Sequence, residues 1–160
     1  MIRRAAIDDV DDLVELIHDL AEYERSPAAV KIDRDLLAAA LFAESPAVSA
    51  HVAEDQGRIV GMAIWFLNFS TWTGHHGIFL EDLYVRPEAR GQGIGRALLT
   101  ALATLAHHSD YTRIDWSVLD WNEPALRFYR SLGAEPMDEW TGYRLSGPEL
   151  AALAGGEPAP

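Results

Sequence analysis

The chain contains no cysteine. Without thiols it can form neither a disulfide nor a cysteine acyl-enzyme, and it offers no thiolate to a metal ion. It also lacks an apolar run of about 18 residues, the length that a membrane span requires, and its start, MIRRAAIDDVDD, is too acidic for a signal peptide. We therefore expect a cytoplasmic protein that uses no cysteine nucleophile and does not associate with a membrane.

Positive charge is scarce, because 13 Lys and Arg face 25 Asp and Glu and the net charge is −12. Such a chain repels the phosphates of a nucleic acid, so we expect no nucleic-acid partner, whereas a cationic partner suits it. Many proteins are acidic for solubility alone, and the positions of particular acids therefore carry more weight than the total. The histidine pairs His75-His76 and His107-His108 diverge on a strand or helix, so we expect no metal site.

Residues 80–95, LEDLYVRPEARGQGIG, join an apolar strand that carries two acids to a glycine-rich turn. The strand Ile78–Val85 is rich in β-branched and aromatic residues, and the turn Arg90–Gly95 opens a helix with apolar positions such as Leu98 and Leu102. Free N–H groups and the dipole at a helix N-terminus attract phosphate, and glycines let it approach. The spacing fits neither a P-loop nor G-x-G-x-x-G, which leaves Arg-x-x-Gly-x-Gly. A turn that merely packs tightly is the structural alternative.

A second motif covers residues 118–134, VLDWNEPALRFYRSLGA. Asn122 is a good N-cap and Pro124 is tolerated in a first turn, so the sequence predicts a helix from about 123 to 132. Its periodicity places Tyr129 on the same face as Ala125, and periodicity alone would make this tyrosine a core aromatic.

Together LEDLYV, RGQGIG, VLDWNEPA and the amino-terminal LAEYE resemble the Gcn5-related N-acetyltransferase (GNAT) superfamily, and within it the diamine acetyltransferases that act on spermidine, spermine or thialysine. The resemblance extends to about residue 147. It implies one acetyltransferase domain over residues 1–147 and a tail, residues 148–160, with a flexible end. Phe69-Ser70-Thr71-Trp72 favours the thialysine type, because the spermidine type carries an acid where Ser70 stands.

The fold that this resemblance implies is an α/β GNAT fold, with a mixed, mostly antiparallel central sheet flanked by helices. In that fold the fourth and fifth strands splay apart and admit the pantetheine arm of acetyl-CoA, the expected cosubstrate. A small cationic amine is the expected acceptor, and a homodimer the expected assembly. Two other functions stay open: a protein acetyltransferase acting on lysine or an N-terminus, and a non-catalytic CoA-binding sensor.

The sequence pattern predicts the element order β-α-α-β-β-β-α-β-α-β. A helix capped by Asp8 follows the first strand, and a second is capped by Asp33 and runs to about Phe42. A turn at residues 55–57 joins two strands as a hairpin. The predicted strands are Ile2–Ala6, Val48–Glu54, Arg58–Phe69, Ile78–Val85, Arg113–Leu119 and a short one near Tyr143–Leu145.

Acetylation of an amine needs a proton acceptor, because an ammonium with a pKa of about 10 is mostly protonated at neutral pH. Glu81 and Asp82 interrupt an apolar strand, where alternation would point them to opposite faces unless a bulge intervenes. Tyr129 can keep its proton at neutral pH and still pass it to a departing thiolate.

The resemblance assigns roles to these residues and to others. It implies that Tyr129 is the catalytic acid, and it places Glu81 in the acceptor pocket, where we take this carboxylate as the catalytic proton acceptor. The residues expected to bind the coenzyme are Leu83, Val85, Arg90, Gly91, Gln92, Gly93, Ile94, Gly95, Arg96, Asn122 and Tyr129. The residues expected to bind the amine are Tyr23, Glu24, Trp72, Glu81 and Asp82.

Overall fold

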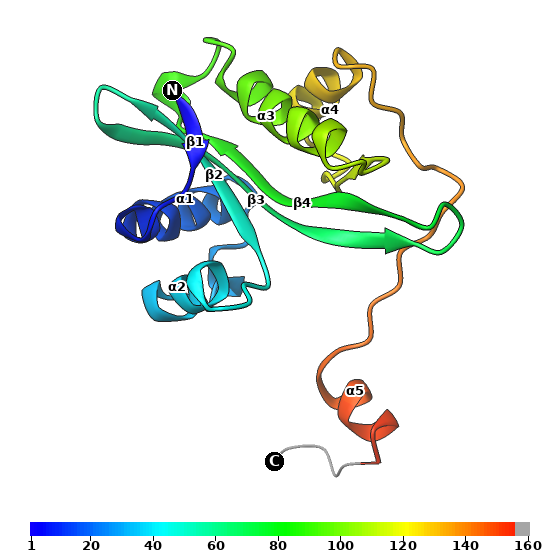
Figure 1. Cartoon of the computed structure of the whole chain (residues 1–160). Coiled ribbons are helices and arrows are strands. Elements are labelled where there is room, and N and C mark those ends of the chain that lie inside the picture. The colour runs from blue at the N-terminus through cyan, green and yellow to red at the C-terminus, as the bar shows by residue number, and fades with distance from the viewer. Residues whose placement is uncertain (156–160) are drawn as a thin grey trace. The chain divides into compact units, whose positions relative to one another are not determined.

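The computed structural model describes residues 1–155, which form two compact units, residues 1–119 and the unit that begins at Asp120. The first unit contains a sheet with α1 and α2 on one face and α3 on the other (Figure 1). None of the helices in residues 1–155 has both the length and the apolarity needed to cross a bilayer.

Within the described residues the sheet has five strands in the order β1-β2-β3-β4-β5. The pairs β1–β2, β2–β3 and β3–β4 are antiparallel, and β4–β5 is parallel. The predicted mixed, mostly antiparallel sheet is thus confirmed. Its strands are β1 (Ile2–Arg4), β2 (Ser49–Asp55), β3 (Arg58–Ser70), β4 (His75–Val85) and β5 (Ile114–Asp115).

The long β3–β4 hairpin and the short β5 depart from the predicted bounds. β4 begins at His75, because its first residues pair with the end of β3 up to Ser70. β5 contains two residues, since it pairs only with Ile78 and Phe79 of β4. A strand persists only where its backbone groups find partners, and that pairing cannot be seen in a local sequence window.

Helix α1 (Val10–Tyr23) follows a 3₁₀ turn, Ile7–Asp9, so its N-cap position falls on Asp9 and the predicted cap at Asp8 is wrong. The Asp9 carboxylate instead accepts hydrogen bonds from the Arg3 guanidinium at 2.6 and 2.8 Å and from the Ala6 N–H at 2.7 Å. This ties the start of the helix to the edge strand β1.

Helix α2 (Arg34–Phe42) begins as predicted. The Asp33 carboxylate accepts from the Leu36 N–H at 2.9 Å, which satisfies one of the N–H groups that lack a helical partner. Helix α3 (Ile94–His108) begins directly after the glycine-rich turn.

Buried leucines of α1 and α2 pack on one face of the sheet, and Leu98, Leu99 and Leu102 of α3 are buried as well. Fully buried side chains on the α1–α2 face include Leu13, Leu16, Leu37, Val52 and Met62. Burying a leucine or a similar side chain contributes roughly 1.5–3 kcal/mol, so this core fixes the ends of α1 and β4 that bear the site.

The second unit holds α4 (Glu123–Arg130) and α5 (Gly147–Leu153). The predicted strand near Tyr143–Leu145 is wrong: these residues adopt no regular structure, and the Tyr143 side chain is 95 % exposed. The described part of this unit, residues 120–155, contains no other strand with which the segment could pair.

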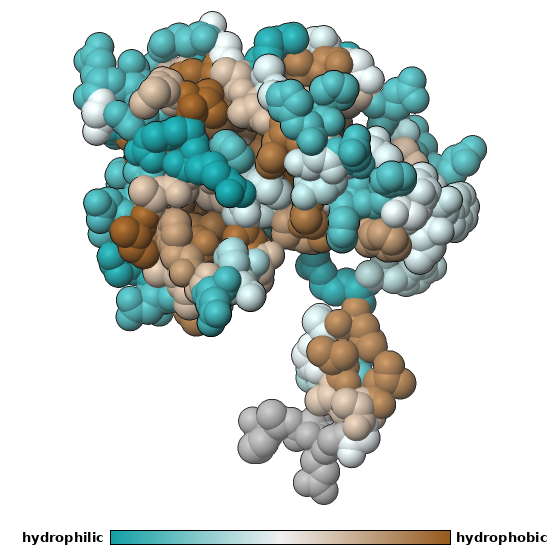
Figure 2. Space-filling view, in the orientation of Figure 1, coloured by the Kyte–Doolittle hydropathy of each residue, from teal (hydrophilic) through white to brown (hydrophobic). Residues whose placement is uncertain are grey.

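The tail beyond residue 147 begins as a helix and not as a loose chain. Leu150 and Leu153 of α5 are exposed, and Figure 2 shows the resulting apolar surface of this helix at the bottom of the view. The predicted flexible end falls on residues 156–160, which lie outside the described residues.

Candidate active site

The glycine-rich turn forms an open cradle at the start of α3. Gly91 and Gly93 have φ angles of 76° and 80°, in the left-handed region that favours glycine. A Cβ atom at either position would meet nothing within 4 Å, so the space above the turn is open. The first turn of α3, which contains Gly95 and Arg96, carries no acidic side chain. Its first N–H groups lack helical acceptors, and the cradle therefore fits the phosphates of a coenzyme.

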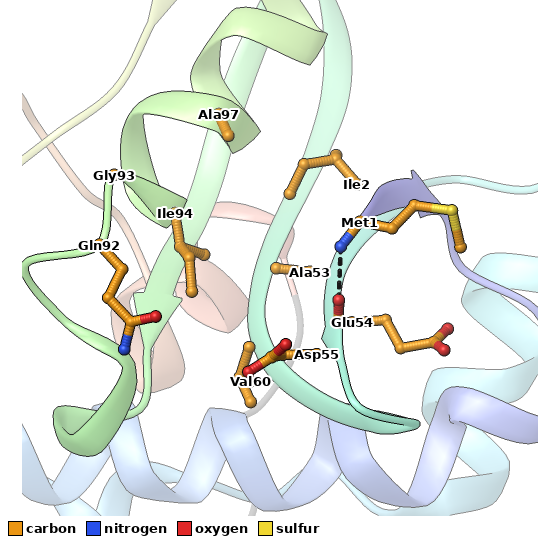
Figure 3. Close-up of a pocket in the computed structure, with 10 residues that line it drawn as sticks. All are labelled: Met1, Ile2, Ala53, Glu54, Asp55, Val60, Gln92, Gly93, Ile94 and Ala97. Carbon is orange, nitrogen blue, oxygen red and sulfur yellow. Dashed lines mark hydrogen bonds between the residues drawn. The ribbon is translucent and has the colours of Figure 1, made fainter.

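A hollow of about 280 Å³ adjoins the cradle (Figure 3). It has residues of the turn and α3 on one side and Met1, Ile2 and Glu54 on the other. No acid of the cluster described below is among its lining residues, so it is a separate feature. The lining residues are Met1, Ile2, Ala53, Glu54, Asp55, Val60, Gln92, Gly93, Ile94 and Ala97.

A bulge in β4 positions the two acids of the strand. Asp82 lies opposite Ile64 of β3, and Leu80 lies opposite the next β3 residue, Trp65, so Glu81 is the extra residue. Bulges of this kind re-aim side chains and recur next to active sites. Asp82 shares its face with Ile64, which belongs to the core beneath α1 and α2. The exposed Glu81 stands beside it.

The charges of two further carboxylates act on Asp82 at this point. Burial raises the pKa of Asp82 to about 6, and the charges of Glu81 and Glu24 add to the shift. Burial also raises the pKa of Glu24, which directly follows α1. The fold therefore brings Glu24 to a pair of acids far away in the sequence, and together they form a site that favours a cation. Within residues 1–155, no group of three or more His, Asp or Glu side chains is arranged so that it could hold a metal ion.

The edge of β4 next to the acids is open. Pairing with β5 covers Ile78 and Phe79 and, within residues 1–155, does not extend to Leu80–Val85. This stretch includes Leu83 and Val85, two of the residues predicted to bind the coenzyme. An extended chain that carries amides, such as pantetheine, could add its hydrogen bonds to such an edge.

Tyr23 lies at the end of α1, close to the cradle. The guanidinium carbon of Arg90 is 5.2 Å from its ring centroid. The same carbon is 5.3 Å from the ring of the buried Tyr84. Sequence reasoning missed Tyr84, although its spacing of two from Asp82 predicts that both side chains lie on one face of the strand.

Trp72 is not brought to the acids within this chain. It lies in the turn of the β3–β4 hairpin with its side chain 84 % exposed. Ile64, the β3 residue opposite Asp82, lies six residues before Ser70 at the hairpin turn. This corresponds to roughly 20 Å along the strand between Asp82 and the turn that carries Trp72. Ser70 stabilises this turn, because its hydroxyl oxygen accepts a hydrogen bond from the Thr73 N–H at 3.3 Å.

Asn122 and Tyr129 belong to α4 in the second unit. The buried Asn122 caps the helix as predicted, because its side-chain oxygen accepts from the Ala125 N–H at 3.3 Å. Tyr129 is partly buried, with its ring 5.3 Å from that of Phe128. Its backbone carbonyl accepts from the N–H groups of Leu132 and Ala134, which closes the helix end.

Comparison with known proteins agrees with this geometry. The model of the acetyltransferase (GNAT) family matches residues 10–134, and so extends across the boundary between the two units. The chain belongs to the GNAT acetyltransferase family. It is an acyltransferase enzyme with the predicted GNAT fold.

This acetyltransferase is similar to named acetyltransferases and to a solved structure along nearly its whole length. It is 39 % identical to a thialysine N-epsilon-acetyltransferase of Bos taurus, over 97 % of each chain. It is 30 % identical to a human spermidine/spermine N(1)-acetyltransferase-like protein, over 96 % of its own length and 23 % of the longer human protein. Among solved structures, an integron cassette protein from the mobile metagenome of V. cholerae matches with a TM-score of 0.81 and 30 % identity over 96 % of each chain.

Proposed function

We propose that this enzyme transfers the acetyl group of acetyl-CoA to a primary amine of a small cationic acceptor, either a thialysine-like amino acid or a short diamine. The observation that carries the proposal is the acid cluster formed by Glu81 and Asp82 of β4, the strand that leads into the phosphate cradle, and by Glu24 at the end of α1. Carboxylates in a partly buried site bind an ammonium through charge-assisted hydrogen bonds.

The same cluster can prepare the amine for attack. The acceptor arrives as an ammonium, and Glu81 and Asp82 as a pair accept its proton. With a pKa of about 6, Asp82 is suited to exchange protons close to neutral pH. The neutral nitrogen then forms a bond to the thioester carbonyl carbon as the carbon–sulfur bond breaks. Tyr129 donates a proton to the departing sulfur, the role that the family resemblance gives it. The nitrogen loses its second proton to solvent as the amide forms, and solvent returns a proton to Tyr129.

The coenzyme is held in this proposal by the cradle and the open strand edge. The backbone N–H groups around Gly93 and Gly95 bind the pyrophosphate, and Arg96 in the first turn adds positive charge. The backbone of Leu83 and Val85 binds the pantetheine amides. Residues 1–147 act as one domain in this scheme, and Asn122 opens the helix that carries Tyr129.

Acetylation of a panel of amines, detected by mass spectrometry, tests the proposal. We expect acetyl transfer to thialysine and short diamines, with a lower kcat/KM for spermidine, because Ser70 stands where the spermidine type has an acid. One charge-assisted hydrogen bond is worth about 1.5–3 kcal/mol, which corresponds to about 10- to 150-fold in kcat/KM. An enzyme that ignores free amines and acetylates peptides would contradict the small-cation assignment. Sedimentation of the same sample tests the predicted homodimer.

A further inference from the structure

Arg90 opens the glycine-rich turn, yet two of its hydrogen-bond donors bind the protein itself. Its backbone N–H donates to the Pro87 carbonyl at 3.2 Å. Its side-chain Nε donates to the carbonyl of Val85, the last residue of β4, at 2.8 Å. These two hydrogen bonds hold Arg90 against the end of β4, so its side chain does not extend freely into solvent.

The guanidinium of Arg90 lies close to two aromatic rings. Its central carbon is 5.2 Å from the centroid of the Tyr23 ring and 5.3 Å from that of the Tyr84 ring. Both distances are within the range of a cation–π contact. Tyr84 is fixed in the core of the sheet, whereas Tyr23 is the last residue of α1. The arginine therefore joins the end of this helix to the sheet.

The end of α1 also carries an acid of the acceptor site. Glu24 follows Tyr23 directly, and its charge is one of those that act on Asp82. A displacement of Tyr23 would move Glu24 relative to the β4 acids. In sites that hold a reacting group in place, a misplacement of about 1 Å can cost about 100-fold in rate.

We infer that Arg90 is a positioning residue for the acceptor side of the site, which holds Tyr23 and therefore Glu24 against β4, and that its side chain is not chiefly a ligand of the coenzyme phosphates. This role rests on the proposed transfer to a cationic amine. Arg90 therefore links the phosphate cradle to the acid cluster. The same residue begins the glycine-rich turn and holds the end of α1, which carries Glu24.

The substitution Arg90→Met tests this role, because it keeps the length of the side chain and removes the cation and the Nε donor. We expect it to raise the KM for the amine about tenfold and to leave the calorimetric Kd for acetyl-CoA within about twofold. The matched control is Arg96→Met in the first turn of α3, where the opposite split is expected, with a Kd for acetyl-CoA raised about fivefold and an unchanged KM for the amine.

A double-mutant cycle with Tyr23→Leu examines the contact directly. If Arg90 acts through Tyr23, the effects of Arg90→Met and Tyr23→Leu on the KM for the amine will be less than additive. The free energies of unfolding will show the same coupling in urea, without any acceptor present. Wild-type activity on the amine panel tests the proposed function separately, so a failure of one conclusion can be told from a failure of the other.

Three results would overturn the assignment. Arg90→Met could weaken acetyl-CoA binding tenfold with no change in the KM for the amine, as expected of a phosphate ligand. It could leave both constants unchanged, as expected of a solvated side chain. Its effect could also add fully to that of Tyr23→Leu, which would show that the two side chains do not act together.

Discussion

The partly buried Asp82 makes stability depend on pH in a defined direction. Its pKa is about 6 in the folded chain, against an ordinary value of 3.8. A shift of about 2 pKa units corresponds to about 3 kcal/mol, and partial exposure of the side chain reduces this to about 2–3 kcal/mol. The stability associated with the neutral carboxyl is fully present below about pH 4 and is lost as the pH rises through about 6.

The substitution Asp82→Asn replaces this carboxyl with a neutral group of the same shape. We expect the free energy of unfolding of the variant, relative to the wild type, to increase by about 1.5 kcal/mol between about pH 5 and pH 8. Urea denaturation followed by circular dichroism at several pH values measures this difference. Other ionisable groups are common to both proteins, and their contributions largely cancel.

A second background makes the experiment specific. In a Glu81→Gln background the effect of Asp82→Asn should become smaller, because one of the charges that raise the pKa of Asp82 is gone. A flat or falling difference for Asp82→Asn alone would refute the account of a carboxylate destabilised by burial.

Three other substitutions test the cradle, the catalytic acid and the sheet. Gly93→Val should weaken acetyl-CoA binding more than tenfold. Strain at a φ of 80° should also lower the free energy of unfolding by about 1–2 kcal/mol. An unchanged affinity for acetyl-CoA, measured by calorimetry on a folded variant, would contradict the phosphate assignment. Tyr129→Phe should lower kcat about 100-fold with little change in Tm, and wild-type turnover would make this tyrosine a structural residue. Gly77→Ala would place a Cβ 2.6 Å from the Asn68 Oδ1 and should cost about 1–3 kcal/mol in urea denaturation, whereas Gly142→Ala, with nothing within 4 Å, should not.

Local chemistry predicted those parts of the fold that depend on neighbours in the sequence. Asp33 and Asn122 cap their helices, because a short polar side chain can reach an N–H three residues ahead. Gly91 and Gly93 adopt positive φ angles in a turn that the sequence already marked by its glycines. The family resemblance then supplied the mixed, mostly antiparallel type of sheet and the roles of the acids.

Features set by long-range pairing could not be predicted in the same way. The bulge at Glu81 depends on the register between β3 and β4, and the short β5 depends on where its pairing with β4 ends. The cap at Asp8 was wrong because Arg3, on a neighbouring strand, fixes Asp9 and shifts the helix start. The stacking of Arg90 on Tyr23 joins segments 67 residues apart, and no sequence window contains both.

The bulge also constrains how the gene for this enzyme can change. Because Glu81 is the extra residue, its loss would leave Leu80 opposite Trp65 and Asp82 opposite Ile64, whereas the loss of a paired residue beyond the bulge, such as Leu83, would turn the side chains that follow it to the opposite face. Point substitutions in this strand alter one side chain at a time, whereas a single codon lost or gained beyond the bulge would rearrange both faces together. We therefore expect codon deletions between Leu83 and Val85 to abolish activity even where alanine substitutions are tolerated, so libraries that vary the acceptor should keep the length of this part of the strand fixed.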